Sequence, residues 1–139
     1  MLKSRIHLIL IVALLAVCAG SAFAQTVASK SDEPKLIATV QDSSAPLKAR
    51  VDACRQLGII GGKDSIAPLA ALLGDEQLSH MARYGLQMNP DPAVDEALRD
   101  ALGKVKGLPL VGVIHTVGYR RDAKAVAVLG NLVTSGSPV

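Results

Sequence analysis

The chain has 139 residues, half of them hydrophobic, which is enough to bury the core of one domain. Aromatic residues are scarce, with one Phe, two Tyr and no Trp. This favours closely stacked helices with cores of Ala, Val, Leu and Ile over a β-sandwich or an aromatic platform for nucleic-acid bases. The formal net charge is +3, but without Lys3 and Arg5 thirteen basic residues face twelve acidic ones, so we expect no nucleic-acid partner.

Residues 1–24 have the pattern of a signal peptide that is removed on export. Its three parts follow in order, a basic start, an apolar run and a small-x-small cleavage site: Lys3 and Arg5, Ile6 to Val17, and Ala22-Phe23-Ala24. The pattern predicts cleavage before Gln25. We therefore expect an exported protein of the periplasm or cell envelope.

Two alternatives for this segment remain. If the segment were left uncleaved, its apolar run would hold the chain to the membrane, and this is the only membrane contact that we expect. Gly20, Ser21 and the Ala-Phe-Ala site favour cleavage instead. Leu15-Ala16-Val17-Cys18 resembles the lipobox of a lipoprotein, although Val17 stands where Gly, Ala or Ser is expected.

Cleavage would remove Cys18 and leave Cys54 as the only cysteine, so no internal disulfide is expected. Leu47, Val51 and Cys54 follow the i, i+4, i+7 spacing of one helix face. We expect Cys54 to be a small buried hydrophobic residue. A reactive thiol or an intermolecular bridge is the alternative.

Residues 25–44 are predicted to be a linker that leads into an N-terminal capping helix. The stretch from Gln25 to Glu33 is polar, and Pro34 to Val40 has the pattern of a short helix. Leu36, Ile37 and Val40 would then cover the first of the helices that follow, because the end of a helical array otherwise exposes apolar surface.

An internal repeat of about thirty residues organises the rest of the chain. At an offset of sixty, the apolar and Gly positions Leu57, Gly58, Ile66, Leu69 and Leu72 match Val117, Gly118, Val126, Leu129 and Leu132. At an offset of twenty-nine, Ala53, Leu57, Leu69 and Leu73 match Ala82, Leu86, Leu98 and Leu102. Each unit has the pattern of a helix, a short turn and a second helix. The sequence predicts an all-α fold, a right-handed α-solenoid of about three helix pairs over residues 45–133.

The first pair is expected near 46–57 and from Asp64 or Ser65 to Leu73, with Ile66, Leu69, Ala70 and Leu73 on one face. The second is expected from Glu76 to Leu86, with Leu78, Met81, Ala82 and Leu86 facing inward, and from Pro92, with Val94, Ala97, Leu98, Ala101 and Leu102 inward.

The third pair starts at Pro109, with Leu110, Val113, Ile114 and Val117 inward, and Gly118 is expected to end its first helix. The second helix follows Asp122, with Val126, Leu129 and Val133 as its buried stripe. Residues 134–139 are a C-terminal turn or the start of a truncated next repeat, and we favour a longer protein. Val128, Leu132, Val111 and Val117 would then face the missing repeat, so we expect self-association through this end.

The repeat units resemble a known family. The Ala-x-x-x-Leu-Gly pattern of Ala53 to Gly58 and the Asp-(x)-Ala-(x)-Pro/Val-x-x-Leu pattern of the partner helices are similar to HEAT repeats of the short class named after phycobilisome lyases. The resemblance covers about residues 45–133 and also extends to the leading repeats of larger exported HEAT-repeat proteins. Gln87-Met88 departs from it, because Gly is expected there. The resemblance implies a fold; it does not imply a reaction.

No enzymatic motif accompanies the repeats, so we expect no catalytic residue, cofactor or metal site. HEAT-like deoxyhypusine hydroxylases hold two irons with His-Glu pairs, whereas His7, His80 and His115 are followed here by Leu, Met and Thr. A phosphate-binding Gly loop and a G-x-S-x-G element are also missing. A site built from His80, His115 and Met81 is the alternative, but isolated histidines without metal-ligand spacing are usually surface residues.

Charged residues gather in two groups along the chain. The acidic group is Asp91, Asp95, Glu96 and Asp100, and the basic group is Lys104, Lys106, Arg120, Arg121 and Lys124. One interpretation is ion pairing between adjacent repeats, each exposed pair contributing under about 1 kcal/mol. The other is that the basic group is an interaction patch for an acidic protein partner of unknown identity. We expect an exported, non-catalytic scaffold; the alternative is an accessory or maturation factor for a cofactor-bearing client, similar to a lyase.

Overall fold

The computed structural model describes residues 28–135, and every regular element within that range is helical. The helices are α2 (Glu33–Gln41), α3 (Leu47–Ile60), α4 (Ile66–Ala70), α5 (Ser79–Met88), α6 (Ala93–Leu102), α7 (Gly107–Arg120) and α8 (Val126–Thr134). Single 3-10 turns precede three of them: η1 (Lys30–Asp32), η2 (Lys63–Ser65) and η3 (Ala123–Ala125). The predicted all-α class is confirmed for these residues.

Some predictions fall on other parts of the chain. The signal peptide of residues 1–24, residues 25–27 of the linker and residues 136–139 of the C-terminal turn lie outside the described residues. Within residues 28–135, no helix combines the length and apolar character needed to cross a membrane.

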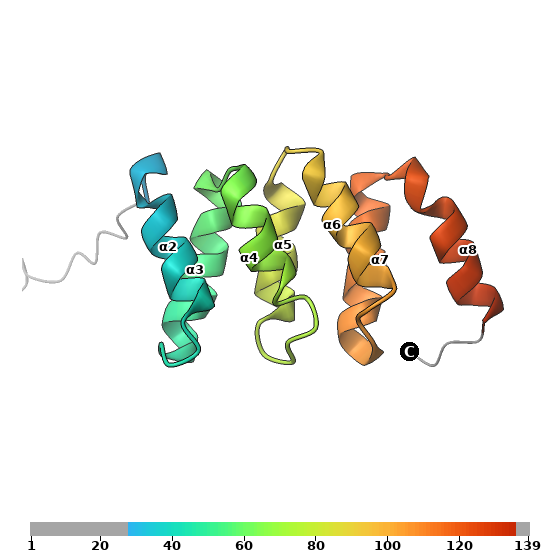
Figure 1. Cartoon of the computed structure of the whole chain (residues 1–139), viewed down its shortest axis with the longest axis horizontal. Helices are drawn as coiled ribbons and strands as arrows, with labels where there is room; N and C mark the ends of the chain where they lie inside the picture. Colours follow the sequence, from blue (N-terminus) through green and yellow to red (C-terminus); the bar gives the residue numbers. More distant parts are fainter. Residues whose placement is uncertain (1–27, 136–139) are drawn as a thin grey trace, which may run out of the picture.

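The helices form two rows. The first row is α3, α5 and α7, which contact one another in succession, and the second row is α2, α4, α6 and α8, which do the same. Between the rows, α2 packs on α3, α4 on α5, and α6 on α7. Figure 1 shows the helices standing side by side in chain order along the longest axis of the molecule.

The core lies between the two rows and uses the repeated apolar positions. Leu57, Leu86 and Val117 from the first row are buried, as are Leu69 and Leu98 from the second. Nine of the other residues that were predicted to face inward are also buried: Ile66, Leu73, Leu78, Ala82, Val94, Ala101, Leu102, Leu110 and Val113. The predicted capping helix is α2, in which Val40 is buried while Leu36 and Ile37 pack against the core.

Two glycines allow α3 and α5 to approach closely. A Cβ added at Gly58 would lie 3.1 Å from the Cα of Gly85, and one added at Gly85 would lie 2.9 Å from Cδ1 of Leu69 and 3.0 Å from the carbonyl oxygen of Cys54. Cys54 is fully buried beside this contact, and its burial raises the pKa of the thiol to about 11. The structure therefore confirms Cys54 as a buried residue, and a neutral thiol is a poor nucleophile.

Several predicted helix ends are wrong by two or three residues. Helix α3 continues past Gly58 to Ile60, and α7 continues past Gly118 to Arg120. Gly58 is used for close packing inside the helix, so it is not the turn residue that its type suggested. Helix α7 instead ends at Arg120 and is followed by Arg121, whose φ of 57° is left-handed. Helices α5 and α7 begin at Ser79 and Gly107, not at Glu76 and Pro109.

The predicted orientation of α8 is wrong. Val126 and Val133 are 68% and 83% exposed, and only Leu129 of the predicted stripe faces the core, together with Val128 and Leu132. The preceding turn explains the rotation, because Ala125 is fully buried and the Asp122 carboxylate is held by Arg99 of α6. Val117, predicted to face a missing repeat, is buried in α7, whereas Val111 is exposed.

Candidate binding groove

A chain of hydrogen bonds connects the turns along one edge of the helix rows. The Glu33 carboxylate accepts a bond of 2.5 Å from the backbone N–H of Gly62, and the Gly62 carbonyl accepts one of 3.0 Å from the side-chain amide of Asn89. The carbonyl of Asn89 in turn accepts a bond of 2.7 Å from Nη1 of Arg120. Turns separated by about thirty residues in sequence are therefore joined directly in space.

The first bond of this chain is reinforced by a cation. Nζ of Lys30 lies 2.7 Å from Oε2 of Glu33 and also donates to the carbonyl of Ile60 at 2.9 Å. Glu33 is buried, and the Lys30 ammonium together with the Gly62 amide lowers the pKa of its carboxyl group. The buried charge of Glu33 is thus balanced by its partners.

Arg120 closes the chain at the other end. Its guanidinium pairs with Asp95 and donates to the carbonyls of Leu86, Gln87, Asn89 and Asp91, and only 12% of its side chain is exposed. Arg99 and Asp122 form a second ion pair between α6 and the turn before α8. These two pairs are contacts between adjacent repeats, so Arg120 is a structural residue and not part of a free docking patch.

The other residues of the predicted basic patch do not gather on one surface. Arg120 binds at the N-terminal end of α6, and Arg121 and Lys124 follow it as exposed residues. Lys104 and Lys106 lie beyond the opposite, C-terminal end of α6, which has ten residues. A helix of that length spans about 15 Å, so the five cations belong to at least two separate places.

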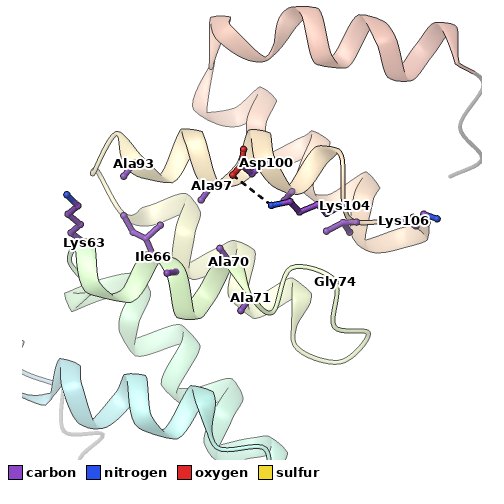
Figure 2. A pocket seen from close by; sticks show the side chains of 13 residues that line it. Lys63, Ile66, Ala70, Ala71, Gly74, Ala93, Ala97, Asp100, Lys104 and Lys106 are labelled. Atoms are coloured by element: carbon purple, nitrogen blue, oxygen red, sulfur yellow. Dashed lines mark ion pairs between the residues drawn. The ribbon is translucent and has the colours of Figure 1, made fainter.

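Lys104 and Lys106 line a groove between α4 and α6 (Figure 2). Its volume is about 880 Å³, and small or apolar residues make up most of its lining: Ile66, Ala67, Ala70, Ala71, Gly74, Ala93, Ala97, Ala101 and Val105. Four charged residues complete the lining: Lys63, Asp100, Lys104 and Lys106. The groove thus combines an alanine floor with a mainly basic rim.

The groove exists because both of its helices carry alanine where they face each other. Ala93, Ala97 and Ala101 follow one stripe of α6 at i, i+4, i+8, and α4 contributes Ala67 and Ala70. Methyl side chains project less into the space beside these helices than larger apolar side chains would, and the groove lies over them. Ala67 and Ala71 are exposed, so this apolar lining is open to solvent.

The charges of the rim stand at opposite ends of the groove. Figure 2 shows Lys63 near Ala93 at one end and Lys104 with Lys106 at the other. Nζ of Lys104 lies 4.0 Å from the Asp100 carboxylate, and both side chains are mostly exposed, so this pair is weak. Three lysines against one aspartate give the lining a net positive charge.

A different surface is formed by the outward side of the first row. Ile59, Met88 and Tyr119 occupy equivalent positions in the three repeat units, and all three are exposed. Tyr84 and His115 are also exposed there, one turn before Met88 and Tyr119. We call these five residues the outward row. Apart from His115, which was weighed as a metal ligand, none of them stands out in the sequence, although Ile59, Met88 and Tyr119 follow the same offsets as the core.

The histidines weighed as metal ligands are both exposed. Nδ1 of His80 lies 3.4 Å from Nη2 of Arg83, and His115 belongs to the outward row. In the described part of the chain, no three or more His, Cys, Asp and Glu side chains form a group that could hold a metal ion.

Lys104 and Lys106 were predicted from the sequence, whereas Lys63 and the alanine floor were missed. The signal for the floor was the stripe of Ala93, Ala97 and Ala101, of which Ala97 and Ala101 were assigned to the core and Ala93 was not considered. In the structure Ala101 is buried, whereas Ala93 and Ala97 are half-buried and line the groove.

The groove offers apolar contact and cations, and the ionisable groups of its lining are one carboxylate and three amines. This composition suits binding of an apolar ligand that carries negative charge. Comparison with known proteins finds no matching family model, no similar curated protein and no similar solved structure. A function for the chain is therefore inferred from its geometry.

Proposed function

We propose that this chain is an exported, non-catalytic, HEAT-like α-solenoid that acts as a scaffold for protein–protein interaction, with the groove between α4 and α6 as its binding surface. The observation that carries the proposal is the alanine floor of the groove, in which Ala67 and Ala71 are exposed to solvent, together with its border of Lys63, Lys104 and Lys106. Exposed apolar surface bordered by polar residues is typical of interaction sites.

The solenoid part of the proposal is supported by how contacts repeat along the chain. Each helix contacts the next helix of its own row, and the chain of bonds through Glu33, Gly62, Asn89 and Arg120 advances by about thirty residues at each step. Nearest-neighbour contacts of this kind are the defining property of repeat proteins. Such arrays present long surfaces to which several repeats contribute.

The groove is a better candidate than the predicted basic patch as a whole. Arg120 is committed to Asp95 and four backbone carbonyls, whereas Lys63 and Lys106 have no carboxylate partner within 4.0 Å in the described part of the chain. The lysines of the groove also lie beside apolar surface. An interface needs such surface, because exposed charge pairs alone contribute little affinity.

The alternative function, an accessory or maturation factor for a cofactor-bearing client, is favoured by the volume of the groove. About 880 Å³ falls within the range of 300 to 1,000 Å³ that is common for small-molecule sites. In that case the groove would hold part of the client together with its cofactor. A stoichiometric pigment or metal on the purified protein would favour this alternative over a pure scaffold.

Site-specific photo-crosslinking tests the proposal in the exported protein. A benzophenone amino acid at Gly103, an exposed position next to Lys104, reports on the groove, and the same group at Tyr119 reports on the outward row. We expect a discrete crosslinked protein from Gly103 and none from Tyr119. Crosslinks from Tyr119 alone would move the binding surface to the first row, and no crosslink from either position would contradict the scaffold function.

A further inference from the structure

We propose that the groove between α4 and α6 binds one α-helix of a partner protein, with a narrow apolar face on the alanine floor and acidic residues at both of its ends. This inference rests on the proposed function and names the chemistry of the partner.

The walls of the groove determine the shape of the occupant. Both walls are helices, α4 and α6, whose backbone N–H and C=O groups bond within the helix, so no strand edge is available to pair with an extended peptide. The floor carries methyl groups from Ala70, Ala97 and Ala101. Such small side chains allow a helix backbone to approach closely, and an amphipathic helix in an apolar groove is a common mode of peptide recognition.

The rim determines the charge of the occupant. Lys63 lies at one end and Lys104 with Lys106 at the other, and Asp100 neutralises Lys104 only weakly, at 4.0 Å. Carboxylates at both ends of a bound helix would therefore meet cations at both ends of the groove. Exposed pairs of this kind contribute more to orientation and association rate than to affinity, and salt screens them over about 8 to 10 Å.

The apolar segment that this chain carries outside the described residues does not fit. Ile6 to Val17 is preceded by Lys3 and Arg5, and residues 1–24 contain no Asp or Glu. Its charges would be repelled by Lys63, Lys104 and Lys106. Charge complementarity thus favours an acidic partner over the chain's own N-terminal segment.

Synthetic peptides provide a direct test on the purified exported protein. The first probe is a fluorescein-labelled amphipathic helix of about 15 residues, which spans about 22 Å, with Ala and Leu on one face and two Glu at each end. The second probe has Lys in place of every Glu. We expect anisotropy titrations at low salt to show binding of the Glu peptide at least about tenfold tighter than that of the Lys peptide, with the difference shrinking as salt screens the charges.

Variants locate this binding. Lys104→Glu combined with Lys106→Glu should reduce the preference for the Glu peptide to about threefold or less, because at one end of the groove attraction to the Glu residues of the peptide becomes repulsion. Ala71→Trp should fill the exposed floor and weaken both peptides. The matched controls, Lys124→Glu and Ala127→Trp, change exposed residues outside the groove and should leave both titrations unchanged. Thermal unfolding by circular dichroism confirms that each variant is folded.

The outcomes separate this inference from the proposed function. Equal binding of the two peptides would overturn the proposal that the partner is acidic. Crosslinks from Gly103 would still support the groove as an interaction site. Binding of the Glu peptide that Ala71→Trp leaves as tight as before would place the peptide elsewhere and overturn the groove as its site. A dimer in analytical ultracentrifugation that Ala71→Trp dissociates would show that the groove binds a second copy of this chain. It would overturn the proposal that a different protein occupies the groove.

Discussion

The side-chain amide of Asn89 donates to the carbonyl of Gly62 at 3.0 Å, and this bond joins the turn after α5 to the turn after α3. Asn89 is buried, and its Oδ1 accepts from the N–H of Asp91 at 2.9 Å. Because its backbone carbonyl also accepts from Arg120, Asn89 links three consecutive turns.

Asn89→Ala should therefore destabilise the fold by about 1 to 3 kcal/mol, since it removes a donor from the Gly62 carbonyl and leaves the N–H of the half-buried Asp91 without its acceptor. Urea denaturation measures the change. Asn131→Ala is the matched control, because Asn131 is exposed on α8, and there a loss of under about 0.5 kcal/mol is expected. Equal effects of the two substitutions would contradict the structural role of Asn89.

Glu33 should make stability depend on pH in the acid range. Lys30 and the Gly62 amide lower the pKa of Glu33 in the folded protein. The unfolded chain therefore binds a proton first, near pH 4.3, so the stabilisation is complete above that pH and is lost as pH falls through the lower folded pKa. Urea midpoints should accordingly drop between pH 5 and pH 3.

Glu33→Gln isolates this contribution. It keeps an oxygen acceptor for the Gly62 N–H but removes the charge, so the drop in midpoint should become smaller. The pKa values of Asp32, Asp42 and Asp52 are lowered as well. The contribution of Glu33 is therefore the difference between the pH profiles of the unmodified protein and Glu33→Gln. Identical pH profiles would show that Glu33 is not ionised in this contact.

Replacing two helical glycines by alanine should change the stability of the protein in opposite directions. Gly130→Ala should stabilise the protein by about 0.5 to 1 kcal/mol, because Ala is the better helix former and a Cβ there meets no atom within 4 Å. Gly85→Ala should destabilise it, because the Cβ would lie 2.9 Å from Leu69 and 3.0 Å from the Cys54 carbonyl. A stabilising Gly85→Ala would mean that α3 and α5 do not pack this closely.

Leu69→Ala and Leu98→Ala should each cost about 2 to 5 kcal/mol, because both side chains are fully buried between the rows and leave a cavity. Leu108→Ala, at an exposed leucine of α7, is the matched control and should cost under about 0.5 kcal/mol. Chemical denaturation gives all three values, and a small effect at Leu69 or Leu98 would show that the repeat register is wrong.

Helix α8 should exchange its amide protons fastest among the helices of the three repeat units. None of its residues is buried, and it lies at the end of the second row in contact with α6. Hydrogen exchange measured by mass spectrometry should therefore show low protection over Val126–Thr134. Protection equal to that of α3 would mean that this end is covered.

The exposed residues of α8 also bear on self-association. Val126 and Val133 present apolar surface on a helix without any charged residue. We expect weak, concentration-dependent association in analytical ultracentrifugation, and Val126→Lys with Val133→Lys should abolish it. A chain that remains monomeric at high concentration would contradict association through this end.

Much of the helical layout could be predicted because the information is local. Apolar residues three and four positions apart reveal the buried face of a helix, and a second copy thirty residues later repeats the same face. Leu86, Leu98 and Val113 were predicted to face inward on this basis, and they are buried. The presence of α2 followed in the same way from Leu36, Ile37 and Val40.

Other features depended on contacts between distant parts of the chain. Gly58 resembled a helix stop because a local pattern cannot show that a neighbouring helix needs its space. The rotation of α8 follows from the bond between Arg99 and Asp122, twenty-three residues apart. Arg120 has the sequence pattern of a surface cation. Its contacts with Asp95 and with the turn after α5, which make it a structural residue, appear only in the folded chain.

The candidate site divides in the same way. The sequence by itself determined that Lys104 and Lys106 are cations next to a helix rich in alanine. Only the tertiary structure decided that Lys63, more than forty positions earlier, lines the same groove, and that Ala93 and Ala97 border open space. Helical periodicity reports which face of a helix is apolar, but how far the neighbouring helix stands from that face depends on side chains from both, and these meet only after folding.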